Sequence, residues 1–183
     1  MKKFLPVIIF VLAFTAAVAG QVVFQFFSET ANAKDNTYAL YEKNFINGKF
    51  KTVDGKNIEI SKLKTPVVIY NFWASWCGPC MEEIPSMVAM KKKFNDDEVI
   101  VLAFNTDEEN QLQSIAKSVK KLNLKNEFQI IADKNTQIAD SFKFSSIPVS
   151  IIFSHGKVVH FSNGPMDFNS EEMIGKLKKW SAN

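Results

Sequence analysis

The sequence predicts an α/β protein in which helices flank a central mixed sheet. Two runs that are apolar apart from Asn71, Val67 to Trp73 and Val99 to Phe104, are rich in β-branched and aromatic residues, and each precedes a helical pattern. Such runs are typical of parallel strands buried on both faces. Two further strand-like runs, Val149 to Phe153 and Lys157 to Phe161, flank a Ser-His-Gly turn and predict an antiparallel hairpin.

The composition indicates a folded domain and excludes several function classes. Of 183 residues, 46% are hydrophobic and 22% are charged, and the formal net charge is +3. This charge is too small to indicate nucleic-acid binding, so we expect no nucleic-acid partner. Both cysteines stand in one C-x-x-C, at Cys77 and Cys80. That arrangement favours redox or metal chemistry over a framework of structural disulfides.

The N-terminal quarter of the chain predicts a membrane segment followed by a tether. We expect residues 1–33 to form a membrane anchor or signal segment with the start of the tether, and residues 34–183 to form the domain. No charged residue occurs from Phe4 to Phe27, and a helix of that length can cross a hydrocarbon core of about 30 Å. Lys2 and Lys3 precede this run, which places the domain outside the cytoplasm, in the periplasm or on the outer face.

Two small-residue sites leave a second reading of the same segment open. Ala17-Val18-Ala19 and Ala31-Asn32-Ala33 both have the A-x-A form that signal peptidase cleaves, in which case the domain is secreted to the periplasm. The length of the apolar run favours the uncleaved anchor. From Ser28 to Asn44 the chain is polar and predicts a tether with little tendency to pack.

An added hairpin is expected before the central strand. Two short strand patterns, Phe45 to Val53 and Asn57 to Ile60, flank Asp54-Gly55, a favoured turn pair. After the cysteines, apolar residues at helical spacing predict a helix from Cys77 to about Phe94, with a kink at Pro85.

The second half of the chain continues the alternation of helices and strands. Asp107 predicts the N-cap of a helix that reaches about Leu122. We then expect a strand from Phe128 to Ile131 and a helix from about Thr136 to Phe142. Ser170 opens a last helix with one apolar face, formed by Met173, Ile174, Leu177 and Trp180.

The cysteine loop has the features of a redox site. A cysteine in the first turn of a helix lies near free N–H groups and the positive end of the helix dipole, so Cys77 is the expected nucleophile. Cys80 follows on the same helix face and is the expected resolving thiol. Pro79 loses no hydrogen bond in the first turn, Gly78 allows another chain to approach closely, and Trp76 is expected to wall the site.

A metal site is the competing reading of the two cysteines. Zinc needs four ligands, and the chain has no second cysteine pair. His155 and His160 could complete such a set, although both positions fit ordinary places on a hairpin. A copper carrier is chemically allowed, because copper(I) accepts soft thiolates. Peroxide reduction is a further alternative, but the chain lacks the T-x-x-C context that it requires. We expect no metal and no cofactor besides the Cys77–Cys80 disulfide.

The segment from Asn71 to Cys80, with Glu83 and Pro85 after it, resembles the thioredoxin superfamily, in particular the anchored thiol-disulfide oxidoreductases of the TlpA/ResA type. The order of the elements from about Phe45 to Trp180 is also similar. The resemblance implies a thioredoxin-like fold with an added N-terminal hairpin and a helix–strand insertion. It also implies that Ile147-Pro148 is a cis peptide bond facing the cysteines, where the chain pairs with an extended substrate.

The resemblance raises a question about proton transfer. Asn71 stands where ordinary thioredoxins have a buried aspartate, and it cannot take a proton. Glu83 resembles an acidic residue of the ResA-type group and could accept the proton of Cys80, or it could be a solvated acid of the first helical turn. Around the cis-proline site, Ser146 and Val149 depart from the usual family pattern.

The resemblance implies an extracytoplasmic thiol-disulfide oxidoreductase. We expect it to reduce disulfides of exported proteins, for example in cytochrome c maturation, with electrons from a DsbD/CcdA-like membrane protein. A thiol oxidase or isomerase of the same fold is the alternative within this class. A copper- or metal-binding module that uses the C-x-x-C is the alternative from another class.

Overall fold

A computed structural model describes the backbone of residues 5–124 and 126–182 and the side chains of residues 14–29, 33–124 and 126–182. The chain divides into two compact units, Met1–Leu40 and Tyr41–Asn183.

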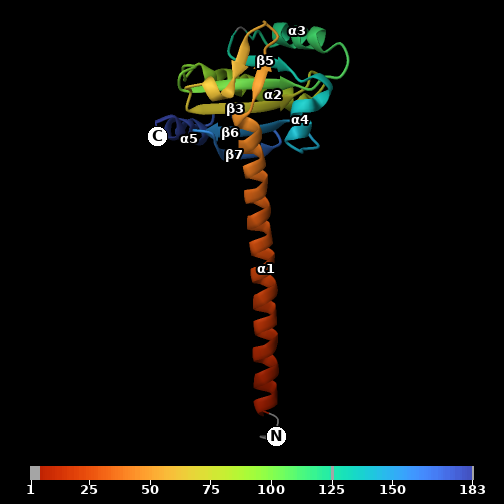
Figure 1. Cartoon of the computed structure of the whole chain (residues 1–183), viewed down its shortest axis with the longest axis vertical. Coiled ribbons are helices and arrows are strands. Elements are labelled where there is room, and N and C mark those ends of the chain that lie inside the picture. Colours follow the sequence, from red (N-terminus) through yellow and green to blue (C-terminus); the bar gives the residue numbers. More distant parts are fainter. Residues whose placement is uncertain (1–4, 125, 183) are drawn as a thin grey trace. The chain divides into compact units, whose positions relative to one another are not determined.

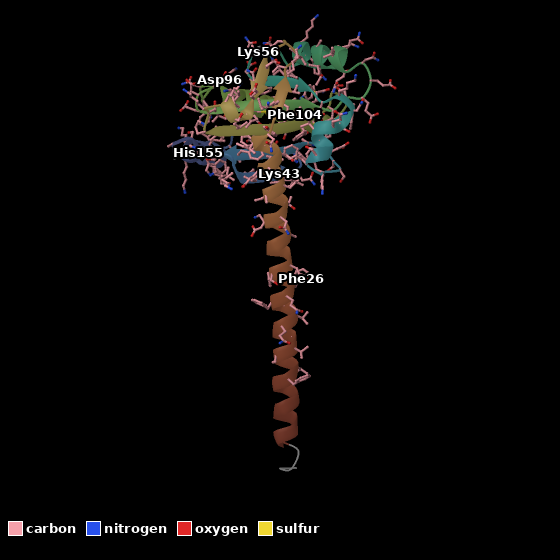
Figure 2. All side chains as sticks on the ribbon, in the orientation of Figure 1. Phe26, Lys43, Lys56, Asp96, Phe104 and His155 are labelled. Atoms are coloured by element: carbon pink, nitrogen blue, oxygen red, sulfur yellow. A yellow bond between two sulfur atoms is a disulfide. The ribbon has the colours of Figure 1, made fainter. Side chains whose placement is uncertain are left out.

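The described residues of the first unit lie in helix α1, Leu5–Ile46. Large apolar side chains of this unit are exposed, among them Phe24 and Phe26, and Figure 2 shows Phe26 projecting from the helix. Among the described residues, no helix has a stretch long and apolar enough to cross a membrane. The predicted anchor, Phe4 to Phe27, lies partly outside the residues whose side chains are described.

The prediction of an unpacked tether from Ser28 to Asn44 is wrong. The described residues of this range are helical, and Tyr41 is only 5% exposed. Phe45, which we expected in a strand, belongs to the end of α1 and is 4% exposed. The ring of Phe45 stacks on that of Phe153 with centroids 4.1 Å apart. Aromatic packing therefore fixes the end of the helix within the second unit.

The second unit contains a five-stranded mixed sheet with the strand order β5-β4-β3-β6-β7 (Figure 1). Strands β5, β4 and β3 are parallel, whereas β6 and β7 run antiparallel to their neighbours. A separate hairpin is formed by β1 and β2. The strands are β1 Lys49–Lys51, β2 Asn57–Glu59, β3 Val67–Trp73, β4 Val99–Asn105, β5 Gln129–Ala132, β6 Val149–Ser154 and β7 Lys157–Asn163.

Helices and short 3-10 turns connect the strands. Helix α3 with strand β5 is the expected helix–strand insertion, and it adds β5 to the edge of the sheet beside β4. Helix α2 continues through Pro85 as one element. The helices are α2 Gly78–Lys91, α3 Gln111–Lys121, α4 Gln137–Ser141 and α5 Glu171–Ala182, and the turns are η1 Ile60–Lys62 and η2 Lys134–Thr136.

Successive side chains of β3 face opposite sides of the sheet, so the core has two parts, one on each face. Val67 and Ile69 face a cluster that includes Met87 and Met90 of α2 and Leu177 of α5. The side chains between them face the other way, as the two-residue period of a strand requires. Tyr70 and Phe72 pack there among other aromatic rings, which are Phe45, Phe50, Phe104, Phe142, Phe144 and Phe153. These rings form an aromatic core on that face of the sheet.

The sheet topology brings two distant segments to one edge. Strand β3 ends at Trp73, just before the cysteines, and β6 begins at Val149, just after Pro148. Because the two strands are antiparallel, Phe72 pairs with Val149. The cysteine loop and the Ile147-Pro148 segment therefore meet at the same end of the sheet.

Candidate functional site

The two cysteines form a disulfide at the start of α2. The sulfur atoms are 2.03 Å apart. Cys77 is the N-cap of the helix, and the backbone N–H of Cys80 points at its Sγ, with an N–S distance of 3.2 Å. When the disulfide is reduced, this N–H and the positive end of the helix dipole favour the thiolate of Cys77.

The two sulfurs differ in their access to solvent. Cys77 is 5% exposed and Cys80 is fully buried. Gly78 and Pro79 between them are exposed. Pro79 lies in the first helical turn, where its missing N–H costs no helical hydrogen bond. An incoming partner sulfur therefore meets Cys77 first.

Trp76 and the Ile147-Pro148 segment border the cysteines from two sides. Trp76 is 72% exposed, whereas Pro148 is buried. The Ile147–Pro148 peptide bond is cis, as the resemblance implies. The carbonyl oxygen of Ile147 lies 3.9 Å from the Sγ of Cys77. The residues that we expected to border the disulfide, Trp76, Ile147 and Pro148, therefore lie next to it in the structure.

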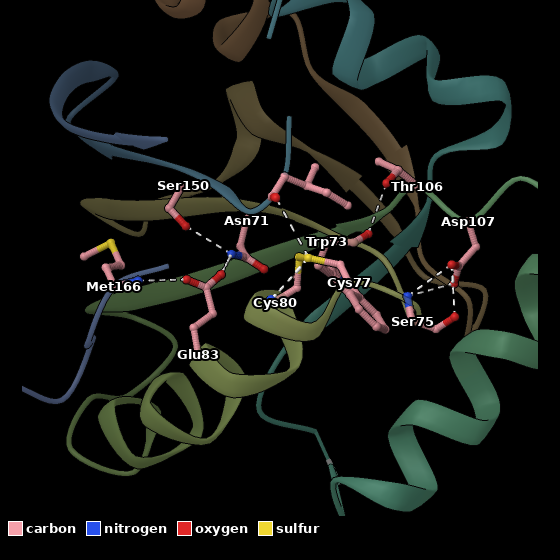
Figure 3. Close-up of a disulfide and its surroundings, with 11 residues drawn as sticks. Asn71, Trp73, Ser75, Cys77, Cys80, Glu83, Thr106, Asp107, Ser150 and Met166 are labelled. Atoms are coloured by element: carbon pink, nitrogen blue, oxygen red, sulfur yellow. Dashed lines mark hydrogen bonds between the residues drawn. A yellow bond between two sulfur atoms is a disulfide. The ribbon is translucent and has the colours of Figure 1, made fainter. Parts of the chain in front are cut away.

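Glu83 is buried beneath the site rather than solvated. Its side chain is 3% exposed, whereas the neighbouring Glu82 is exposed. Asn71 Nδ2 donates to Glu83 Oε1 at 2.6 Å, and the backbone N–H of Met166 donates to Oε2 at 3.2 Å (Figure 3). Burial raises the pKa of Glu83, and the hydrogen bonds from Asn71 and Met166 partly offset this effect. The pKa of Glu83 therefore lies above that of an exposed glutamate.

Asn71 holds Glu83 in place through a network that sequence reasoning missed. Its Nδ2 also donates to the hydroxyl of Ser150 at 3.0 Å, and Ser150 is fully buried (Figure 3). The two residues are partners in the β3–β6 register, 79 positions apart in the chain. Both lie on the face of the sheet that α2 covers. Only the alternation of strand residues could have indicated Ser150.

A second contact ties α2 to the segment that begins at Met166. The Ser86 hydroxyl donates to the Glu83 carbonyl oxygen at 2.8 Å and accepts from the backbone N–H of Phe168 at 3.1 Å. Because Phe168 is fully buried, this segment is fixed next to the helix. Main-chain donors such as these leave no signal in a sequence.

The loop before Cys77 is anchored to the end of β4. The Asp107 carboxylate accepts from both the backbone N–H and the hydroxyl of Ser75, at 3.1 and 3.0 Å, and from Asn105 Nδ2 at 2.9 Å. The prediction that Asp107 caps the next helix is wrong, since the N-cap of α3 is Asn110. Asp107 instead positions the loop that carries Cys77.

His155 lies far from the cysteines, beyond the opposite end of β3. Ser154 pairs with Val67 at the start of β3, and His155 follows it, whereas Cys77 follows the other end of that strand. Seven strand residues separate these ends by roughly 20 Å. Among the described residues no group of three or more His, Cys, Asp or Glu side chains could hold a metal ion.

Comparisons with known proteins agree with this site. The family model described as the AhpC/TSA family matches residues 42–161. The thiol-disulfide oxidoreductase ResA of Bacillus cereus is 34% identical over 128 residues, which is 69% of this chain and 70% of that protein. The sporulation thiol-disulfide oxidoreductase A of Bacillus subtilis is 28% identical over 132 residues, which is 72% of this chain and 75% of that protein.

A solved structure shows the same architecture. The crystal structure of StoA from Bacillus subtilis superposes with a TM-score of 0.59 and 27% sequence identity, and covers 73% of this chain and 95% of that chain. The predicted thioredoxin-like fold is confirmed. The chain belongs to the AhpC/TSA family and, within it, to the thiol-disulfide oxidoreductases of the ResA type.

Proposed function

We propose that this oxidoreductase acts outside the cytoplasm as a reductase of disulfides in exported proteins, with Cys77 as its nucleophile. The observation that carries the proposal is the asymmetry of the two sulfurs. Cys77 caps α2 and accepts the N–H of Cys80, whereas Cys80 is fully buried. The capping sulfur is thus the one stabilised as a thiolate and the one a partner can reach.

The reaction consists of two exchanges. In the first, the Cys77 thiolate attacks a substrate disulfide, a Cys77–substrate disulfide forms, and the second substrate sulfur leaves as a thiolate that takes up a proton. In the second, Cys80 loses its proton and attacks the Cys77 Sγ, which releases the remaining substrate thiolate. The product is the Cys77–Cys80 disulfide, so the protein needs no other cofactor for this step. A dithiol donor then reduces the disulfide.

Glu83 is the proposed acceptor of the Cys80 proton. It lies one turn after Cys80 on α2, and burial raises its pKa. Ile147 and Pro148 are the proposed contact for the substrate chain beside Cys77, with Trp76, Gly78 and Pro79 on the other side. The names of the relatives include thiol-disulfide oxidoreductase, which supports the reaction class.

A pair of single-sulfur variants tests the assignment of roles. The Cys80→Ser variant should accumulate mixed disulfides with substrates, because Cys77 can attack but nothing resolves the adduct. The Cys77→Ser variant is the matched control and should accumulate none. Each variant is expressed in its own membrane compartment and quenched with acid. The mixed disulfides are then detected on a non-reducing gel. Adducts that form through Cys80 alone would contradict the proposal.

The direction of the reaction is tested by the redox potential. The Gly-Pro pair between the cysteines motivates the reductase reading, and potentials in this fold range from about −270 mV for thioredoxin to about −120 mV for DsbA. Equilibration of the protein with glutathione should give a midpoint toward the thioredoxin end. A midpoint near the DsbA end would instead show a thiol oxidase.

The location and partners belong to the same proposal. The charge-free run from Phe4 to Phe27 supports an uncleaved anchor with the domain outside, and the resemblance supports a DsbD/CcdA-like electron donor and substrates such as apocytochrome c. Intact mass of the mature protein tests the anchor. A mature chain that starts at Gly20 or Lys34 would refute it.

A further inference from the structure

A groove beside the disulfide adjoins the site and is lined by apolar, acidic and hydroxyl side chains. Its volume is about 480 Å³, within the range of roughly 300 to 1,000 Å³ typical of binding clefts. Trp76 and Ile147, which border the cysteines, are among its lining residues. Glu108 from the loop after β4, Asp140 and Phe144 also line it, together with smaller residues, which are Thr106, Thr136, Ala139, Ser145 and Ser146.

The position of the groove makes it a surface for a protein substrate. The Ile147 carbonyl oxygen at its edge lies 3.9 Å from Cys77 Sγ. A partner chain whose cysteine reaches Cys77 therefore passes the mouth of the groove. An extended chain advances about 3.3 Å per residue, so residues a few positions from that cysteine can enter the groove.

The walls of the groove combine apolar rings with negative charge. Trp76 is 72% exposed, and Phe144 and Ile147 are partly exposed, so all three offer apolar surface to a ligand. Glu108 and Asp140 are exposed acids, and Thr136 holds Asp140 through a contact of 3.2 Å between its Oγ1 and Oδ2. None of the described residues that line the groove is a lysine.

The negative charge continues past Trp76. A second hollow of about 340 Å³ shares Trp76 and Glu108 with the groove and adds Glu109 to its lining. The chain as a whole carries a formal net charge of +3, so this acidic surface departs from the average of the protein. Lys134 and Lys143 lie near Asp140 in sequence, but neither lines the groove.

We infer that the groove selects protein substrates in which a lysine or arginine and an apolar residue lie within a few positions of the reactive cysteine. The inference rests on the proposed function, since it assigns a substrate class to the same site. Opposite charges across a solvent-exposed surface raise the association rate and reject partners of the wrong charge. Trp76 and Phe144 supply the apolar contact.

Synthetic peptides test the charge preference. Each peptide carries one cysteine, an apolar neighbour and either lysine or glutamate three positions away, and its cysteine is joined by a disulfide to 2-nitro-5-thiobenzoate. The Cys77 thiolate of the reduced full-length protein attacks the peptide sulfur and releases the coloured thiolate. Cys80 then displaces the peptide thiol and leaves the Cys77–Cys80 disulfide. Second-order rate constants follow from the absorbance of the released thiolate.

The lysine peptide should react about five- to tenfold faster than the glutamate peptide, in keeping with two exposed ion pairs of modest strength. High salt should reduce this ratio toward one, because exposed charges are screened. The Glu108→Lys/Asp140→Lys variant should reverse the preference. Asp97→Lys, an exposed acid just before the opposite end of β4, is the matched control and should keep the wild-type ratio.

Failure of the groove assignment and failure of the proposed function give different results in this assay. Equal rates for the two peptides, or a ratio that salt leaves unchanged, would overturn the groove assignment while the exchange reaction stands. A protein that releases no coloured thiolate from either peptide would overturn the proposed function together with the inference. The salt series uses the unmodified protein, so it decides the matter even if the double variant does not fold.

Discussion

Replacing Asn71 with alanine should destabilise the protein more at high pH than at low pH. Asn71 Nδ2 donates to the buried Glu83 carboxylate at 2.6 Å and to Ser150 at 3.0 Å. A hydrogen bond to a charged group contributes about 1.5 to 3 kcal/mol, whereas one between neutral groups contributes about 0.5 to 1.5 kcal/mol. The loss should therefore be about 2 to 4 kcal/mol when Glu83 is charged and about 1 to 3 kcal/mol when it is protonated.

The direction of the pH dependence follows from the folded-state pKa. Burial already raises the pKa of Glu83, and loss of the Asn71 donor raises it further. A raised folded-state pKa makes the folded form relatively more stable below the ordinary glutamate value and less stable as the pH rises through the new pKa. The extra penalty of the variant therefore develops with rising pH.

Urea denaturation of the oxidised protein from about pH 4 to about pH 9 measures this difference. The loss of unfolding free energy caused by Asn71→Ala should be about 1 kcal/mol larger at the highest pH than at the lowest, as the difference between charged and neutral hydrogen bonds requires. The same substitution in a Glu83→Gln background is the control, and its penalty should not change with pH. A penalty for Asn71→Ala that is constant across this range would refute the reasoning.

Three further predictions concern stability. Phe45→Ala should lower the free energy of unfolding by about 3 to 5 kcal/mol, because Phe45 is 4% exposed and stacks on Phe153. A decrease of less than about 1 kcal/mol, measured by denaturant unfolding, would mean that the end of α1 is not packed. Tyr70→Phe should stabilise the protein by about 1 kcal/mol, because the buried hydroxyl has no hydrogen-bond partner among the residues that the structure describes, and a destabilised variant would reveal one. Asp133→Ala should lower the unfolding free energy by about 1 to 2 kcal/mol, because its carboxylate accepts two backbone N–H groups at the start of α4, and Asp133→Asn should lose less.

The central strands and the last helix were predictable from the sequence. The predicted strand Val67 to Trp73 matches β3 at both ends, because a long β-branched and aromatic run has few alternatives to a buried strand. The predicted helix after Ser170 is confirmed, with Met173, Ile174 and Leu177 buried. Short apolar runs carry less information, which is why Phe45 was assigned to a strand instead of the end of α1.

The reactive sulfurs were predictable, but their surroundings were only partly so. The motif identified Cys77 and Cys80 because the chemistry needs those residue types at that spacing. It could not show that Asn71 links Glu83 to Ser150, since that link depends on how β3 and β6 align. Asp107 was misassigned for a similar reason, because its partner Ser75 lies 32 positions away and becomes a neighbour only in the folded sheet.

The most direct test of the account is the order in which the two thiols of the reduced protein react. Iodoacetamide is added at about pH 7, where an ordinary thiol of pKa about 8.5 is mostly protonated, and the alkylated sites are mapped by mass spectrometry of proteolytic peptides. The account predicts that Cys77 is alkylated rapidly while Cys80, which is fully buried, remains unmodified. Equal or faster alkylation of Cys80 would contradict the claim that the capping sulfur is the nucleophile.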